Sequence, residues 1–302
     1  MRYGLPYMGS KNKIADWVVD CLPPAEHFYD LFCGGCAVTH AALTRRKYKT
    51  YHVNDITDMG YVFQKLVTEE YRPDYHWVSR KEFEANKEKD ILMALCWSFG
   101  NDGNEYLYGK DIESTKKACH YAVCFEDYAL ADELGIDLHK LDGISDIQKR
   151  YSVYKKLWRE KYVSRPDLGG GGTHNVNERL FQLERVNNYG CNYGGGVIAT
   201  KGDYQDVEVA PGAVVYCDCP YKNTHTYKNG QDSFDYERFY EWCLSREYPV
   251  FVSEYQMPSE FKPIARKTRV GSMSAKGGKE LRTETLFVQA RFSEHYKRDL
   301  FI

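Results

Sequence analysis

Residues 28–55 limit the fold more than any other part of the chain, because they follow the order strand, glycine turn, helix, strand. Residues 28–32 form a short apolar run, Gly34 and Gly35 make a turn, and 37–46 has a helical pattern. A second apolar run at 51–53 ends at Asn54 and Asp55. This order predicts a βαβ unit within a parallel sheet, and open sheets of this kind bind ligands at the carboxyl ends of their strands.

The rest of the chain predicts one α/β domain with an insertion. Strand patterns return after 197, at 214–217, 249–253, 266–270 and 284–290, with a helical pattern at 236–245. The segment 71–190 instead has mostly helical patterns, including 175–188, and glycine runs at 169–172 and 194–196 are suited to act as hinges. We therefore expect an α/β domain formed by 1–70 and 191–302, and a helical domain formed by 71–190.

Composition excludes several classes of protein. The chain has 302 residues, of which 43% are hydrophobic and 28% charged, and it contains no run of about eighteen apolar residues that would predict a transmembrane helix. Its first residues have no apolar signal core, so we expect a cytoplasmic protein whose ten cysteines are reduced thiols. With a net charge of −2, any contact with nucleic acid has to come from a local basic segment such as 262–282.

Residues 214–221 (VVYCDCPY) combine a buried strand pattern with groups suited to one kind of chemistry. The exocyclic amine of a nucleobase is a poor nucleophile, because its lone pair is delocalised into the ring. Asp218 and the backbone carbonyl of Cys219 are placed to accept its two N–H groups, while Tyr221, after Pro220, offers a ring on which a flipped base can stack. An ordinary strand followed by a turn would give a similar sequence, so the other segments have to decide.

Those segments carry a family resemblance. Residues 218–221 (DCPY) resemble the Asp-Pro-Pro-Tyr motif of amino-methylating DNA methyltransferases, with Cys219 in place of the first proline. Other segments follow in the order of the same family: 7–11 (YMGSK), 30–36 (DLFCGGC), 54–56 (NDI), 98–103 (SFGNDG), 202–206 (GDYQD), 251–255 and 282–286. The chain thus resembles a Dam-type, D12 class DNA adenine-N6 methyltransferase of the phage or prophage kind.

The resemblance implies a Rossmann-like S-adenosylmethionine-dependent methyltransferase sheet with a helical target-recognition insertion. Its catalytic residues would be Asp218, Cys219, Pro220 and Tyr221. The cofactor S-adenosyl-L-methionine would contact Tyr7, Lys11, Asp30, Phe32, Gly34, Asp55, Ile56, Asp203 and Tyr204. Double-stranded DNA would contact Asn101, Tyr106, Arg269, Lys276, Lys279 and Arg282. A bacterial or phage-encoded enzyme of this family needs no metal, no membrane and no obligate protein partner.

Two cysteines depart from the family pattern and leave alternatives open. Cys219 keeps a backbone carbonyl but not the rigid backbone of proline. Cys36 replaces a glycine, where a side chain either crowds the cofactor or has to adopt a backbone angle that favours glycine. The alternatives are a catalytically impaired DNA-binding relative, an enzyme acting on the N4 amine of cytosine, and a zinc site formed by Cys33, Cys36, Cys217 and Cys219. The sequence does not specify the DNA site, a cognate restriction enzyme or the oligomeric state.

Overall fold

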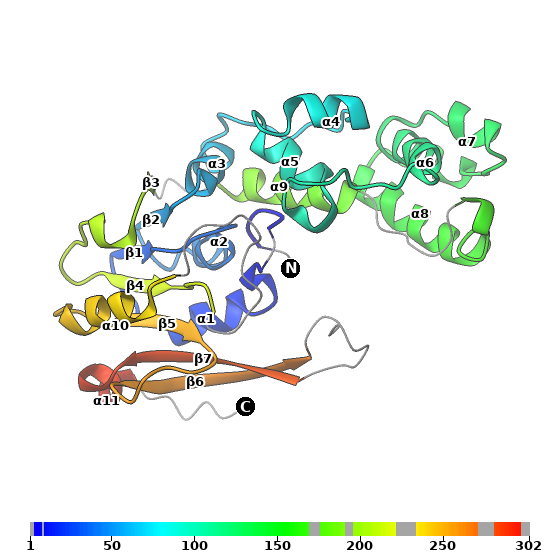
Figure 1. Ribbon diagram of the computed structural model, residues 1–302. Helices are drawn as coiled ribbons and strands as arrows, with labels where there is room; N and C mark the ends of the chain where they lie inside the picture. The colour runs from blue at the N-terminus through cyan, green and yellow to red at the C-terminus, as the bar shows by residue number, and fades with distance from the viewer. Residues whose placement is uncertain are drawn as a thin grey trace. The chain divides into compact units, whose positions relative to one another are not determined.

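The chain folds into two compact units (Figure 1). A computed structural model describes residues 3–7, 9–168, 176–190, 196–221, 234–270 and 281–296, with the backbone alone at 166, 189, 190, 269, 270, 281 and 282. Unit 1 consists of Met1–Leu5, Ser10–Glu70 and Val186–Ile302, and unit 2 of Pro6–Gly9 and Tyr71–Arg185. None of the helices in these described ranges is long and apolar enough to span a bilayer.

Unit 1 is built on a seven-stranded sheet of order β3-β2-β1-β4-β5-β7-β6. The first five strands in this order are parallel, whereas β7 is antiparallel to both β5 and β6. The strands are β1 (His27–Asp30), β2 (Thr50–Asp55), β3 (Val197–Lys201), β4 (Val214–Cys217), β5 (Val250–Glu254), β6 (Phe261–Val270) and β7 (Leu281–Gln289). The predicted α/β fold with a parallel βαβ unit is therefore confirmed, and the order of strands reverses between β1 and β4.

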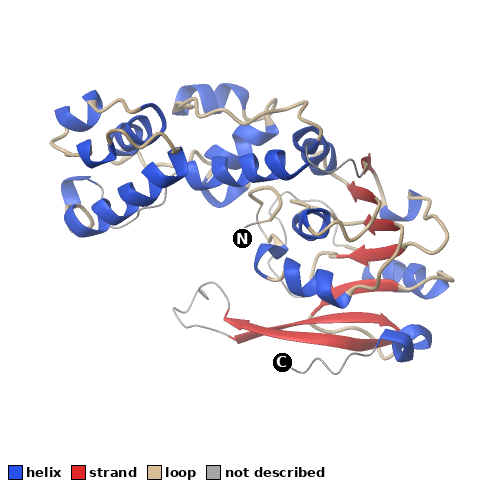
Figure 2. Ribbon diagram, turned by 180° about the vertical axis from the view of Figure 1, so that it is seen from behind, coloured by secondary structure: helices blue, strands red, loops and turns tan. Residues whose placement is uncertain are grey.

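Alternation along the strands divides the core of unit 1 between the two faces of the sheet. On one face, Tyr29, Val215 and Val252 pack with Phe239 and Trp242 of α10 (Tyr236–Ser245). The opposite face is covered by α2 (Ala37–Thr44) and α3 (Met59–Val67), with α1 (Ala15–Cys21) beside α2. Figure 2 shows helices on both faces of the strands. Strands covered on both sides have nearly continuous apolar sequences, as β4 and β5 do.

Unit 2 is helical in its described part. Its main helices are α4 (Arg80–Asn86), α5 (Ile91–Trp97), α6 (Glu113–Phe125), α7 (Ala129–Glu133) and α8 (Ile147–Lys161), and α9 (Asn177–Gly190) begins in it. In α8, Tyr151, Tyr154, Leu157 and Trp158 are buried. This spacing places one apolar stripe against the core, which explains why the sequence folds here as a helix.

The glycine-rich turn after β1 contains one residue that does not suit its backbone. Cys36 has φ 54° and ψ 34°, in the left-handed region, and its side chain is fully buried. A side chain in this region costs about 1–2 kcal/mol. The expectation that Cys36 has to adopt a backbone angle favouring glycine is thus confirmed, while its burial keeps the thiol inside the protein.

The amino-terminal segment is tied to the same turn by close backbone contact. Gly4 N donates to Nδ1 of His40 at 2.9 Å, and Leu5 N donates to the carbonyl of Gly35 at 2.7 Å. Gly4 has φ 67°, and a Cβ there would lie 2.2 Å from the Gly35 oxygen and 2.7 Å from Ala37 N. Only glycine fits at this position.

We predict that Gly4→Ala lowers the free energy of unfolding by about 3 kcal/mol, because both the positive φ and the backbone clash oppose a Cβ. Gly212→Ala is the matched control, since Gly212 has φ 71° with nothing within 4 Å of a Cβ. The free energy of unfolding of the control should fall only by the cost of a side chain at positive φ, about 1 kcal/mol. Urea unfolding measures both, and equal losses would show that the contact with the turn is not tight.

Candidate active site at the carboxyl ends of β1, β2 and β4

Parallel pairing of β1 with β4 brings the acids of two motifs to one edge of the sheet. The register pairs Asp30 with Tyr216, and Leu31 N donates to the Tyr216 carbonyl at 3.0 Å. Asp30 therefore ends β1 beside the end of β4, with Asp218 just beyond it. Because the strand order reverses between these two strands, this edge is the position at which open α/β sheets bind ligands.

Lys11 contacts two of the predicted catalytic residues. It lies in a short 3-10 helix, Lys11–Lys13, for which Ser10 Oγ accepts from Asn12 N. The Lys11 ammonium lies 2.7 Å from Asp218 Oδ1, and it lies over the ring of Tyr221, 4.2 Å from the ring centroid. The side chains of Lys11 and Asp218 are only 10% and 19% exposed. Asp218, Tyr221 and Lys11 thus form one partly buried cluster.

Glu284 and Tyr255 also belong to this cluster, although neither is among the predicted site residues. The Tyr221 hydroxyl donates to Oε2 of Glu284 at 2.7 Å, and the rings of Tyr221 and Tyr255 meet edge to face with centroids 4.8 Å apart. Glu284 lies in β7 and is 1% exposed. A carboxylate inside the strand sequence LRTETLFVQ is the available signal, because a buried acid requires a partner.

Burial and neighbouring charges shift the pKa values of Lys11 and Asp218 in opposite directions. Burial lowers the pKa of Lys11, but the negative charges of Asp218 and Glu284 outweigh it, so the pKa is raised and the ammonium stays charged. Burial raises the pKa of Asp218, and the Lys11 ammonium opposes that rise. Lys11 and Asp218 thus each oppose the effect of burial on the pKa of the other.

Asp30, at the end of β1, is a further buried acid of this edge. Its side chain is 2% exposed, and Oδ2 accepts from Thr39 Oγ1 of α2 at 2.7 Å. Its Oδ1 has no hydrogen-bond partner among the described residues. Burial, with the nearby charges of Asp218 and Asp55, raises the pKa of Asp30 to about 7, although the bond from Thr39 opposes the rise. A cationic or hydrogen-donating ligand would satisfy this oxygen.

Asp55 ends β2 and fixes the glycine turn. Oδ2 accepts from Gly34 N at 2.9 Å, while Oδ1 accepts from the backbone and hydroxyl of Thr57. The preceding Asn54, which the predicted site omits, connects three strand ends. Its Nδ2 donates to the carbonyls of Leu31 and Gly202, and its Oδ1 accepts from Thr200. The ends of β1, β2 and β3 are consequently held in one arrangement.

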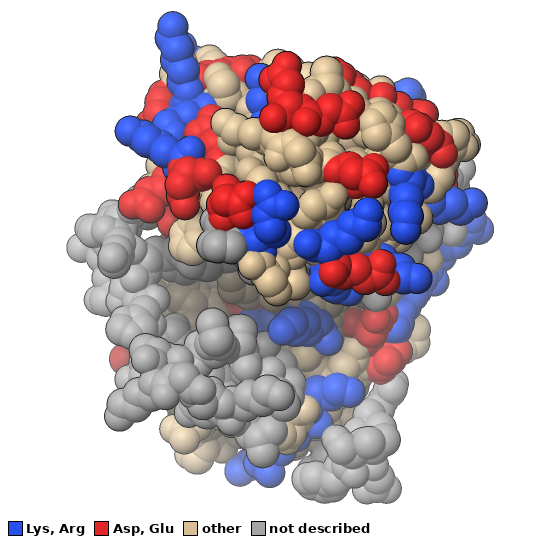
Figure 3. Space-filling model, turned by 90° about the vertical axis from the view of Figure 1, so that its right-hand side faces the viewer, with Lys and Arg blue, Asp and Glu red and all other residues tan. Residues whose placement is uncertain are grey.

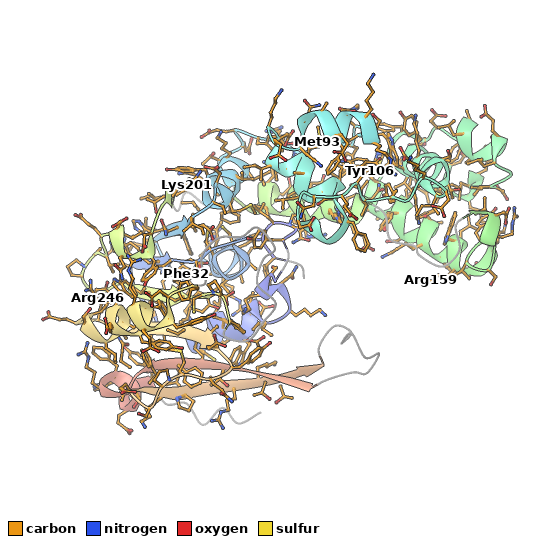
Figure 4. The ribbon with its side chains drawn as sticks, in the orientation of Figure 1. Phe32, Met93, Tyr106, Arg159, Lys201 and Arg246 are labelled. Atoms are coloured by element: carbon orange, nitrogen blue, oxygen red, sulfur yellow. The ribbon has the colours of Figure 1, made fainter. Side chains whose placement is uncertain are left out.

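The predicted cofactor contacts Asp203 and Tyr204 lie on the α10 side of this edge. Tyr204 is buried, with its ring centroid 5.1 Å from that of Phe32 and 5.0 Å from that of Trp242. Phe32, labelled in Figure 4, also contacts Phe239 of α10. Asp203 is paired with Arg238 at 3.0 Å and accepts from Gln205 N. Arg238 is a contact that the sequence did not predict.

Two predicted cofactor residues are not placed in these clusters. Tyr7 is half-buried and belongs to the short segment that groups with unit 2. Ile56 is 66% exposed, immediately after β2. Exposure of so large an apolar side chain at a strand end is compatible with a ligand contact but does not require one.

The predicted DNA-contacting residues are divided between the units. In unit 2, Tyr106 (Figure 4) is 5% exposed, and its hydroxyl donates to the Val78 carbonyl. Its ring therefore belongs to the core of that unit. Phe99 in the same loop is 69% exposed instead, and beside it Asn101 has φ 62° while its amide donates to the Leu95 carbonyl. The surface aromatic of this loop is Phe99.

The remaining predicted DNA contacts belong to the hairpin of β6 and β7. The backbone register pairs Arg269 with Arg282 across the two strands. Lys276 and Lys279 lie outside the described residues. Figure 3 shows one face of the molecule, on which Lys and Arg side chains are interspersed with Asp and Glu. Charges of both signs are thus mixed on that face, in keeping with the net charge of −2.

The cysteines of the two strand ends are separate thiols. Cys217 and Cys219 pack in the core on the α10 side, and the sulfurs of Cys33 and Cys36 each lie 3.8 Å from the Gly34 carbonyl. Within the described residues, which include all four, no three His, Cys, Asp or Glu side chains are grouped as a metal site requires. The alternative of a four-cysteine zinc site is not supported.

Comparison with known proteins identifies the class of this chain. The family model of the D12 class N6 adenine-specific DNA methyltransferases matches residues 7–257. A comparison with curated proteins gives no match. The chain belongs to the D12 family: it is an enzyme that methylates the N6 amine of adenine in DNA, and its sheet is of the Rossmann-like methyltransferase type. The family is adenine-specific, so the alternative of cytosine as the target is set aside.

We predict that Asp30→Asn makes the stability of the protein less dependent on pH. Between the ordinary aspartate value of 3.8 and about 7, the folded wild type binds more protons than the unfolded chain, so its free energy of unfolding falls as the pH rises. Asparagine has no carboxyl group that can take up this proton, and its side-chain oxygen can still accept a hydrogen bond from Thr39 Oγ1. Urea unfolding at pH 4.5, 6 and 8 gives the free energy of unfolding of both proteins. The value for the variant minus that for the wild type should increase with pH.

Removal of an exposed acid is the control for that measurement. Asp206→Asn changes the same charge at an exposed position. The opposing result is a difference in the free energy of unfolding between Asp30→Asn and wild type that is as independent of pH as the difference for Asp206→Asn. That result would mean that burial does not raise the pKa of Asp30.

Proposed function

We propose that the carboxyl-end edge of unit 1 binds S-adenosylmethionine and that Asp218, the Cys219 carbonyl and Tyr221 act on the target adenine. The observation that carries the proposal is the cluster of Asp218 and Tyr221 beside Asp30 at the reversal of strand order. Asp30 supports the cofactor assignment, since a buried oxygen without a partner fits the ammonium of the methionine part. Asp55 and Gly34, which are hydrogen-bonded to one another beside it, are the next groups that we propose to contact the cofactor.

S-adenosylmethionine supplies a methyl group on a sulfonium, which is a good leaving group. The protein has to make the adenine amine a better nucleophile. Asp218 and the Cys219 carbonyl accept its N–H groups and localise the lone pair, and Tyr221 holds the ring in place. The Tyr221 ring is itself oriented by the bond from its hydroxyl to Glu284. Catalysis is then mainly orientation and hydrogen bonding.

We further propose that unit 2 is the target-recognition domain and that the β6–β7 hairpin contacts phosphates. Exposure of Phe99 and the left-handed turn at Asn101 support a DNA contact by this loop. Burial of Tyr106 removes it from the proposed contacts. At the hairpin, the basic segment 262–282 of the sequence includes Arg269 and Arg282, whose backbones are paired in β6 and β7.

Asp218→Ala should lower the rate of methyl transfer by about 10²- to 10⁴-fold, because it removes the acceptor for the amine. The assay is transfer of labelled methyl from S-adenosylmethionine to mixed-sequence duplex DNA, followed by nucleoside analysis for N6-methyladenine. Asp206→Ala is the control acid. Near-normal activity of Asp218→Ala would contradict the mechanism.

Neutralising the hairpin should flatten the salt dependence of DNA binding. For Arg269→Gln, Lys276→Gln, Lys279→Gln and Arg282→Gln combined, the slope of log K against log salt should fall by about 0.9 per phosphate contact, or about 3.6 for four. Fluorescence anisotropy at several salt concentrations measures it. The control replaces four exposed lysines elsewhere, Lys13, Lys65, Lys89 and Lys140. Equal slopes in the hairpin variant and the wild type would remove this assignment.

A further inference from the structure

Lys11 makes, in the protein alone, the two contacts that the proposed function gives to the target adenine. Its ammonium lies 2.7 Å from Asp218 Oδ1, where the amine would donate, and 4.2 Å from the centroid of Tyr221, where the base would stack. We propose that Lys11 is a stand-in for the target base, which occupies Asp218 and the ring of Tyr221 until adenine displaces it. This inference rests on the proposed catalytic roles of Asp218 and Tyr221.

The chemistry of the two occupants is similar enough for exchange. An ammonium donates hydrogen bonds to a carboxylate and is attracted to the face of an aromatic ring. Adenine offers an N–H donor for the carboxylate and a flat ring for the aromatic face. A base that stacks on this face of Tyr221 and donates to Asp218 needs the space that the ammonium fills, so both cannot be present in this arrangement.

Glu284 offers the displaced lysine a second partner. Its carboxylate is 1% exposed, accepts from the Tyr221 hydroxyl, and adds to the electrostatic stabilisation of the Lys11 charge. Leaving a buried charge unpaired is costly. The long and flexible lysine side chain can therefore leave Asp218 without losing all of its charge compensation, if it stays close to Glu284.

The exchange has a consequence for specificity. With Lys11 in place, Asp218 is neutralised and the ring face of Tyr221 is covered. A base that makes only one of the two contacts replaces only one of the two interactions that Lys11 makes with Asp218 and Tyr221. Adenine, which makes both, is favoured in the competition over bases without an N–H donor at this position.

The test measures how far the target adenine leaves the helix when Lys11 is changed. The target site is first mapped by sequencing DNA methylated by the wild type, and 2-aminopurine is then placed beside the target adenine as a fluorescent reporter of lost stacking. Full-length protein is titrated without S-adenosylmethionine. We expect Lys11→Met to raise the reporter signal at saturation, with the flipping equilibrium increased about fivefold. Lys13→Met, at an exposed neighbouring position, should match the wild type.

A second variant gives an effect of opposite sign. Glu284→Gln can still accept from Tyr221 but no longer attracts the displaced ammonium, so it should lower the flipping equilibrium. In the double variant with Lys11→Met, the effect of Glu284→Gln should disappear, because the two residues act through one charge. Residues with a merely structural role would lower the signal in both single variants.

The outcomes separate this inference from the proposed function. A wild type that methylates adenine and unstacks it, together with a Lys11→Met signal no higher than that of the wild type, would overturn the stand-in role alone. A wild type that gives neither methylation nor unstacking would overturn the proposed function itself. If Lys11→Met does not fold, a Glu284→Gln signal equal to or above that of the wild type overturns the stand-in role.

Discussion

Burial of carboxylates at one sheet edge is the constraint on which the candidate site depends. Parallel pairing of β1 with β2 and β4 brings Asp30, Asp55 and Asp218 to the same side, and burial, with smaller contributions from the charges of Asp218 and Asp55, raises the pKa of Asp30. Each acid is accommodated differently. Asp218 pairs with Lys11, Asp55 accepts from Gly34 N, and Asp30 takes up a proton near neutral pH.

The first residues of the chain complete a site whose other parts come from far along the sequence. Gly4 and Leu5 bond to His40 and Gly35, which anchors this segment to the turn after β1. Tyr3 N donates to Asn12 Oδ1 within the segment that carries Lys11. The position of the ammonium at Asp218 thus depends on the same glycine turn that Asp55 holds. The glycine turn after β1 and Asp218 are thus connected through Asn12 and Lys11 in one arrangement of hydrogen bonds and an ion pair.

The two cysteines that depart from the family pattern are tolerated for different reasons. Cys219 is 3% exposed and packs with Cys217 in the apolar core beside α10. Cys36 keeps the left-handed backbone that the turn requires and is fully buried near Cys33. Neither substitution alters the acids at the sheet edge. Their effect is on the backbone and on core packing.

By itself, the sequence determined the α/β fold, the helical character of the described part of 71–185 and the family. Strand and helix periodicity are local, and acids after apolar runs mark strand ends wherever the strands pair. Tertiary structure decided which groups meet. Lys11 on Asp218, Glu284 on Tyr221 and Arg238 on Asp203 join distant segments, and packing, which no local pattern records, exposed Phe99 and buried Tyr106. Contacts of this kind depend on strand order and burial, which are properties of the whole chain.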